Sequence, residues 1–138
     1  MASFNKYEVF GENLSEKVHD LNADTLKVML SNTAPNAATH ELRSQATELG
    51  AGNGYTSGGD DVQNATSRSG GTTSITGVDT VVTASGAVGP FRYDILYNDT
   101  PTSPLDPLIG WWDYGSSISL ASGETFTSDF GASLFTVA

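Results

Sequence analysis

The chain has 138 residues and no cysteine, which excludes disulfide frameworks, thiolate metal sites and cysteine nucleophiles. Sixteen acidic side chains against six basic ones give a formal net charge of -10, which argues against nucleic acid and anionic membrane as partners. Aromatic and branched apolar residues are still plentiful, so we expect a folded chain with a single domain over residues 1–138.

The N-terminal segment has the pattern of an amphipathic helix, because apolar side chains recur at spacings of three and four residues. Gly11 weakens such a helix by about 1 kcal/mol relative to alanine, so we expect its apolar face to dock on a sheet. The prediction is an N-terminal helical segment over residues 1–22, followed by a β-sandwich over residues 23–138. The apolar positions of the helix are Tyr7, Phe10, Leu14, Val18 and Leu21.

The middle of the chain alternates between a strand pattern and loops. Residues 26–31 alternate between apolar and polar side chains, which predicts a half-buried strand. The periodicity is lost over residues 32–40, and a short helix is expected within residues 41–49 because Gly50 follows at the capping position. Residues 50–59 are rich in glycine, which predicts a shaped loop whose backbone needs positive φ or close approach.

The C-terminal half carries the stronger β signals. One or two strands with a turn at Gly70 are expected within residues 60–76. Proline-rich residues 98–107 predict a stiff surface loop, and residues 108–114 predict a strand buried on both faces. Together with the helix, seven or eight short strands predict a mainly β fold, an antiparallel sandwich or jelly-roll-like domain. The other expected strands lie at residues 80–84, 91–97, 118–120, 126–130 and 134–137.

No motif in the chain indicates a catalytic, cofactor or metal site. His19 and His40 lack the spacing of metal ligands, so we expect both to be solvated. The glycine-rich loop lacks the lysine and flanking elements of a phosphate cradle, and no nucleophile elbow is present. The carboxylates are spread through turns without a calcium-loop spacing. We predict a protein that is not an enzyme, although an unmarked pair of carboxylates leaves a small hydrolase as an alternative.

Two adjacent tryptophans stand in the strand predicted over residues 108–114. Trp111 and Trp112 must point to opposite faces of a sheet, so one is expected in the core and the other under the helix or a neighbouring subunit. An open platform for a sugar or a protein is the alternative. The candidate protein-interface residues are Trp111, Trp112, Tyr114, Phe10 and Tyr7.

Four segments resemble small structural proteins of tailed bacteriophages. They are NTAPNAATH at 32–40, GNGYTSGG at 52–59, GPFRYDILYNDT at 89–100 and DPLIGWWDYGSS at 106–117. The likeness extends from the N-terminal helix to Phe130 and excludes the Ser/Thr-rich residues 60–77. It implies a virion protein of the head-decoration (cement) type, with no catalytic residues.

The resemblance also implies partners and a location. A cement protein binds the major capsid protein or another virion protein, and a homotrimer is expected because closed symmetry covers strand edges. The first residues contain no apolar run long enough for a signal peptide or a membrane span. We therefore expect synthesis in the host bacterial cytoplasm and a final place on the capsid surface. A tail, neck or fibre component that binds another virion protein or a host glycan is the alternative.

Overall fold

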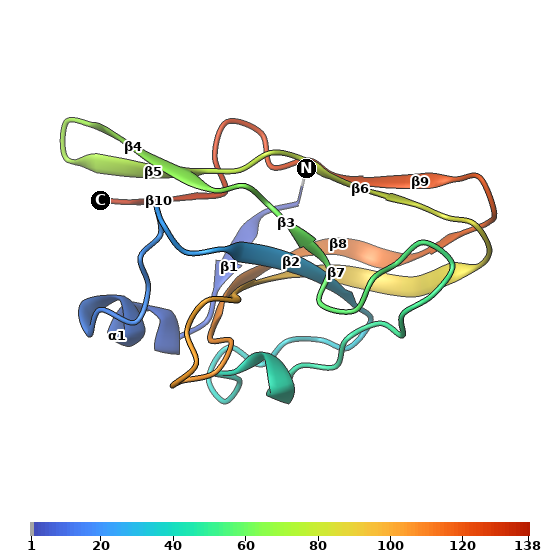
Figure 1. Cartoon of the computed structure of the whole chain (residues 1–138), viewed down its shortest axis with the longest axis horizontal. Helices are drawn as coiled ribbons and strands as arrows, with labels where there is room; N and C mark the ends of the chain where they lie inside the picture. The colour runs from blue at the N-terminus through green and yellow to red at the C-terminus, as the bar shows by residue number, and fades with distance from the viewer. Residues whose placement is uncertain (1) are drawn as a thin grey trace.

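The main sheet of the protein has five antiparallel strands in the order β1-β8-β7-β2-β3. It is seen in a computed structural model that describes residues 2–138. The long central strands β7 and β8 form its middle (Figure 1). The strands are β1 Phe4–Lys6, β2 Leu26–Ser31, β3 Asp60–Asp61, β7 Val88–Asn98 and β8 Leu108–Leu120.

A second layer lies over one face of the main sheet, above it in Figure 1. It consists of a three-stranded sheet, β10-β5-β4, and a two-stranded sheet, β6-β9. The predicted mainly β fold is therefore confirmed, and the layers are consistent with a β-sandwich. The strands are β4 Ala65–Ser69, β5 Thr72–Thr76, β6 Thr80–Thr83, β9 Thr125–Ser128 and β10 Phe135–Val137.

Both faces of the main sheet are buried. Toward the second layer, Leu96 and Trp112 pack with Ile75 of β5, while Phe91 packs with Val82 of β6. On the other face, which we call the outer face, a separate cluster contains Tyr7, Met29, Tyr93, Ile95, Tyr97 and Leu108. This two-sided burial explains the apolar runs at residues 95–97 of β7 and 108–112 of β8.

The N-terminal helix is much shorter than the predicted segment over residues 1–22, which is a correction. Helix α1 covers only Val9–Ser15, and the residues before it form strand β1, in which Phe4 lies opposite Trp112. The helix ends because Lys17 adopts a left-handed backbone conformation with φ 67°. Strand β1 before the helix and the left-handed residue Lys17 after it therefore limit α1 on its two sides.

The other helical element is also short. The helix expected within residues 41–49 is a single 3-10 turn, η1 Arg43–Gln45, whose start is capped by the Gln45 side chain. Neither η1 nor α1, the helices of residues 2–138, has the length and apolarity needed to cross a bilayer. The strand expected at residues 118–120 is the end of β8.

Candidate functional site

Glu48 holds together the loops that cover the outer face of the main sheet. Its carboxylate accepts hydrogen bonds from Arg43 Nη2 at 2.7 Å, the Tyr55 hydroxyl at 2.6 Å and the Gly58 N–H at 2.5 Å. Burial acts to raise the pKa of Glu48, but these hydrogen bonds overcome it and lower the pKa. The ionised carboxylate is therefore part of the loop structure.

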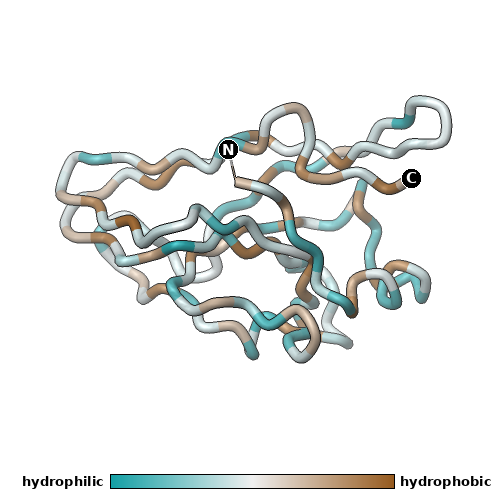
Figure 2. The backbone as a smooth tube through the Cα atoms, turned by 180° about the vertical axis from the view of Figure 1, so that it is seen from behind, coloured by the Kyte–Doolittle hydropathy of each residue, from teal (hydrophilic) through white to brown (hydrophobic). Residues whose placement is uncertain are grey.

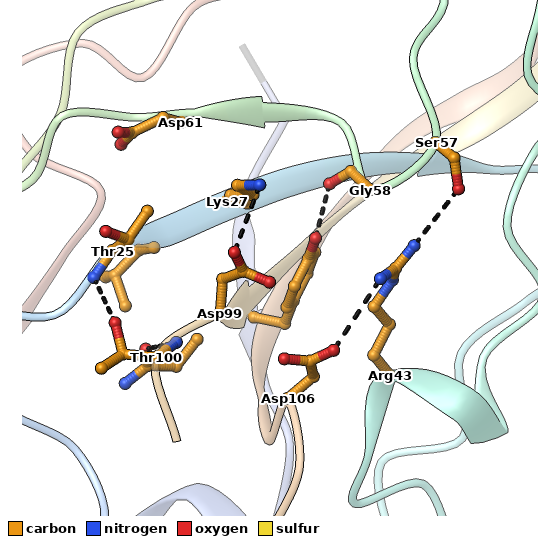
Figure 3. Close-up of polar contacts among 12 residues, drawn as sticks. Thr25, Lys27, Arg43, Ser57, Gly58, Asp61, Asp99, Thr100 and Asp106 are labelled. Atoms are coloured by element: carbon orange, nitrogen blue, oxygen red, sulfur yellow. Dashed lines mark hydrogen bonds and ion pairs between the residues drawn. The ribbon is translucent and has the colours of Figure 1, made fainter. Parts of the chain in front are cut away.

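Arg43 extends this network to a second loop (Figure 3). Its guanidinium lies over the Tyr97 ring, 5.2 Å from the centroid, and its Nη1 lies 3.8 Å from Asp106 Oδ2. A depression of about 380 Å³ beside Arg43 is lined by Glu48, Leu105 and Asp106. Because Arg43 is already paired with both Glu48 and Asp106, we interpret these contacts as structural links between the loops.

A third ion pair ties the proline-rich loop to strand β2. Lys27 Nζ lies 3.2 Å from Asp99 Oδ2, and the Thr25 N–H donates to the Thr100 hydroxyl at 2.8 Å (Figure 3). The predicted stiff surface loop at residues 98–107 is therefore anchored on the outer side of the sheet. Ion pairs this exposed contribute little stability individually, so the backbone contacts matter more.

Asp94 is the buried acid of the sandwich, and sequence reasoning did not single it out. Its Oδ2 accepts hydrogen bonds from the Tyr114 hydroxyl at 2.8 Å and the Ser128 hydroxyl at 2.7 Å. Burial raises its pKa to about 6, although both hydrogen bonds act to lower it. The sequence did offer a signal, because Asp94 is a charged residue within the alternating apolar and polar pattern of residues 91–97. The contacts of Asp94 are structural, joining β7 to β8 and β9.

His19 is buried, so the prediction that it is solvated is wrong. Only 6% of the residue is exposed, and its Nδ1 lies 3.0 Å from Asn98 Nδ2. Because Asn98 Nδ2 also donates to Asp24 Oδ2 and its Oδ1 accepts from the Thr100 N–H, the amide orientation is set. His19 Nδ1 is therefore an acceptor, and the proton lies on Nε2, which lacks a partner within residues 2–138.

The second histidine is half-buried. His40 Nδ1 accepts a hydrogen bond from the Asn36 N–H at 3.2 Å, within the loop that precedes η1. Among the residues that the structure describes, no three His, Asp or Glu side chains gather in a way that could hold a metal ion. Both histidines thus make hydrogen bonds within the fold that their spacing in the sequence did not predict.

The two tryptophans point to opposite faces of β8, as predicted. Trp112 is 4% exposed between the layers, while half-buried Trp111 contacts the Tyr7 ring on the outer face at a centroid distance of 4.8 Å. Tyr7 and Phe10 are also buried. The interface role predicted for Tyr7, Phe10, Trp111, Trp112 and Tyr114 stays a prediction, and within a single chain Tyr7, Phe10 and Trp112 are largely covered by their own fold. Trp111 and Tyr114 remain partly exposed.

An apolar groove lies where the two layers of the sandwich end beside α1. It has a volume of about 580 Å³, and we call it the edge groove. The Phe4 ring of β1 stacks on the Phe135 ring of β10 at 4.9 Å, and Phe10 of α1 meets Phe135 edge-on at 5.5 Å. Figure 2 shows the last strand in brown and α1 with both brown and teal. The lining residues are Phe4, Lys6, Phe10, Gly11, Leu14, Phe135, Thr136, Val137 and Ala138.

Two sheet edges border the edge groove. Among the strands within residues 2–138, β1 pairs only with β8, and β10 pairs only with β5. Each therefore has one side whose backbone N–H and C=O groups have no strand partner. A second cavity of about 530 Å³ shares Leu14 and Val137 with the groove and extends past His19. The edge groove and this second cavity therefore adjoin each other.

Of the interface residues predicted from the sequence, Phe10 lines the edge groove. Sequence reasoning missed Phe4 and Phe135, which meet only when both layers are assembled. Gly11 was a usable signal, because glycine inside a short helix is unfavourable without a reason. Comparison of the chain with protein-family models, curated proteins and solved structures gives no match.

Proposed function

We propose that this protein is a non-enzymatic structural protein of a tailed-phage virion, which decorates and stabilises the capsid by binding the major capsid protein. The edge groove is the observation that carries this proposal, together with the sequence resemblance. An open sheet edge beside apolar side chains is a template for pairing with another chain. Phe4 and Phe135 provide the apolar surface next to the edges of β1 and β10.

The rest of the surface suits such a role. A cement protein must bury area against the shell and leave a charged surface toward solvent. The net charge of -10 supplies that surface. The loops on the outer face are held by Glu48 and Arg43, so little conformational freedom remains to be lost when a partner binds.

Self-association into a homotrimer is part of the proposal. The three-stranded sheet ends in β10 on one side and in β4 on the other. One edge can therefore serve contacts between subunits while the edge groove faces the shell. Light scattering of the purified protein should give three times the 14.4 kDa mass of one chain. A monomer at high concentration would contradict the trimer.

The decisive experiment is a capsid reconstruction combined with mass spectrometry of purified particles from the phage that encodes the chain. We expect the protein at high copy number, with matching density on the outside of the head shell. Density in the tail, neck or fibres would support the alternative role in those structures. Absence of the protein from purified particles would refute a virion role of either kind.

A further inference from the structure

We infer that the edge groove binds an extended, basic and apolar segment of a partner protein, which adds to β10 as a further strand. The inference rests on the proposed function, because it specifies what the capsid partner supplies. Three features of the groove carry it: the position of the β10 backbone, the missing side chain of Gly11 and the charges around α1.

The backbone of β10 itself borders the groove. Successive side chains of a strand point to opposite faces, so a cavity on one face touches every second residue. Phe135, Thr136 and Val137 all line the edge groove, which means that the groove lies along the strand edge. An added strand would lie about 4.8 Å away and would pair with the free N–H and C=O groups of β10.

Gly11 leaves room for the side chains of the added strand. A Cβ at this position would approach nothing closer than Lys6 Nζ at 3.8 Å, and the backbone there is ordinary helix. An alanine would therefore fit, and it would stabilise α1. The absent side chain instead opens the apolar wall formed by Phe10 and Leu14. Alternate apolar side chains of the partner can occupy this space.

The charges near the groove favour a basic segment. From Lys6 to Asp24 the chain carries two lysines and five carboxylates. The side chains of Glu8, Glu12 and Glu16 on and beside α1 are exposed. A second copy of this chain would bring another charge of -10 to the contact, so like-charge repulsion opposes self-pairing here. Lysine or arginine on a partner strand would meet these exposed carboxylates of α1, whereas Lys6, the one charged side chain that lines the groove itself, would disfavour a cation placed beside it.

Binding is tested with a fluorescently labelled synthetic peptide, Lys-Val-Thr-Val-Lys-Val-Lys. We expect saturable anisotropy changes and chemical-shift changes at the backbone amides of residues 135–137. Replacing every lysine by glutamate should weaken binding about tenfold or more. Methylating alternate peptide nitrogens should weaken it to a similar extent, because it removes the strand hydrogen bonds. No binding of the parent peptide, or equal binding of all three peptides, would overturn the inference.

The matched variants are Gly11→Leu and Gly11→Ala. Both raise helix propensity, so both should melt at or above the temperature of the parent. Gly11→Leu fills the groove and should weaken peptide binding about tenfold, whereas Gly11→Ala should bind nearly as the parent. Equal peptide binding by the leucine variant would refute the groove as the site. A change in oligomer mass with this variant would identify a second copy as the occupant and overturn the inference.

Capsid co-sedimentation separates this inference from the proposed function. If Gly11→Leu loses capsid binding while Gly11→Ala and the parent retain it, the result supports both the groove as the binding site and the decoration role. Equal capsid binding by Gly11→Leu and the parent rejects the groove as the capsid site and leaves the decoration role standing. Peptide binding without any capsid binding by the parent protein rejects the decoration role and supports the groove as a strand-accepting site.

Discussion

The carboxylate of Asp94 on β7 accepts a hydrogen bond from the hydroxyl of Ser128 on β9 at 2.7 Å, and this contact joins the two layers of the sandwich. Asp94 is fully buried, and its Oδ1 has no partner within residues 2–138. Burial of an acid in such a place favours the protonated form, which explains the raised pKa of about 6.

Stability should depend on the protonation of Asp94. Its ordinary pKa is 3.8, so between pH 4 and 6 the folded chain retains a proton that the unfolded chain has lost. The contribution of Asp94 to the free energy of unfolding should therefore fall as pH rises through this window, by up to about 3 kcal/mol. Asp94→Asn lacks this contribution, so urea unfolding at several pH values should give the variant a different pH profile from the parent. An unchanged pH profile would contradict the burial argument.

His19 should produce the opposite dependence. Burial lowers its pKa from 6.5 to about 4, while Asp24 acts to raise it. The unfolded chain therefore binds more protons between these values, and the free energy of unfolding should rise with pH there. The slopes of His19 and Asp94 oppose each other, so the parent should show a nearly flat profile. The free energy of unfolding should rise with pH in Asp94→Asn and fall with pH in His19→Gln. A change in the same direction in both variants would contradict the assignment.

Tyr7 and Tyr97, two of the buried tyrosines of the outer face, should respond differently to loss of their hydroxyls. The Tyr7 hydroxyl has no partner within residues 2–138, whereas the Tyr97 hydroxyl donates to the Gly58 carbonyl at 2.7 Å. Tyr7→Phe should be neutral or stabilising, because it removes a buried group without a hydrogen bond. Tyr97→Phe should lower the free energy of unfolding by about 1 kcal/mol. Thermal and urea unfolding of the pair measure the difference, and equal losses would contradict it.

Gly59 is a position of the glycine-rich loop that admits no other residue. It has φ 76°, and a Cβ there would lie 1.7 Å from the Val28 carbonyl oxygen on β2. Gly59→Ala should therefore destabilise the fold by about 3 kcal/mol or more, or prevent folding. Gly50→Ala, whose Cβ would meet nothing within 4 Å, is the control and should stay within about 0.5 kcal/mol of the parent. A folded, stable Gly59→Ala would refute this close approach.

Replacement of the tryptophans should separate folding from surface contacts. Trp112 lies in the core beside Phe4 and Phe130, so Trp112→Ala should cost about 3–5 kcal/mol. Trp111 contacts Tyr7 but is only half-buried, so Trp111→Ala should remain folded. Circular dichroism and urea unfolding measure both effects. A larger loss for Trp111 than for Trp112 would contradict their placement.

Local sequence patterns determined the strands and their faces. The alternating residues 26–31 and 91–97 form β2 and β7, and the turn expected at Gly70 joins β4 to β5. The strand at residues 26–31 is buried on both faces, however, so the prediction that it is half-buried is wrong. The opposite facing of Trp111 and Trp112 follows from the geometry of a single strand. These features were predictable because each depends only on neighbouring residues.

Only the tertiary structure decided the long-range features. Asp94 and Ser128 are 34 positions apart, and His19 meets Asn98 across 79 positions. Strand β1, which pairs with β8, and the left-handed residue Lys17 limit α1 on its two sides, and the edge groove exists because β1 and β10 end their sheets side by side. Periodicity specifies which side chains of a strand are buried, but strand order determines which edge stays open.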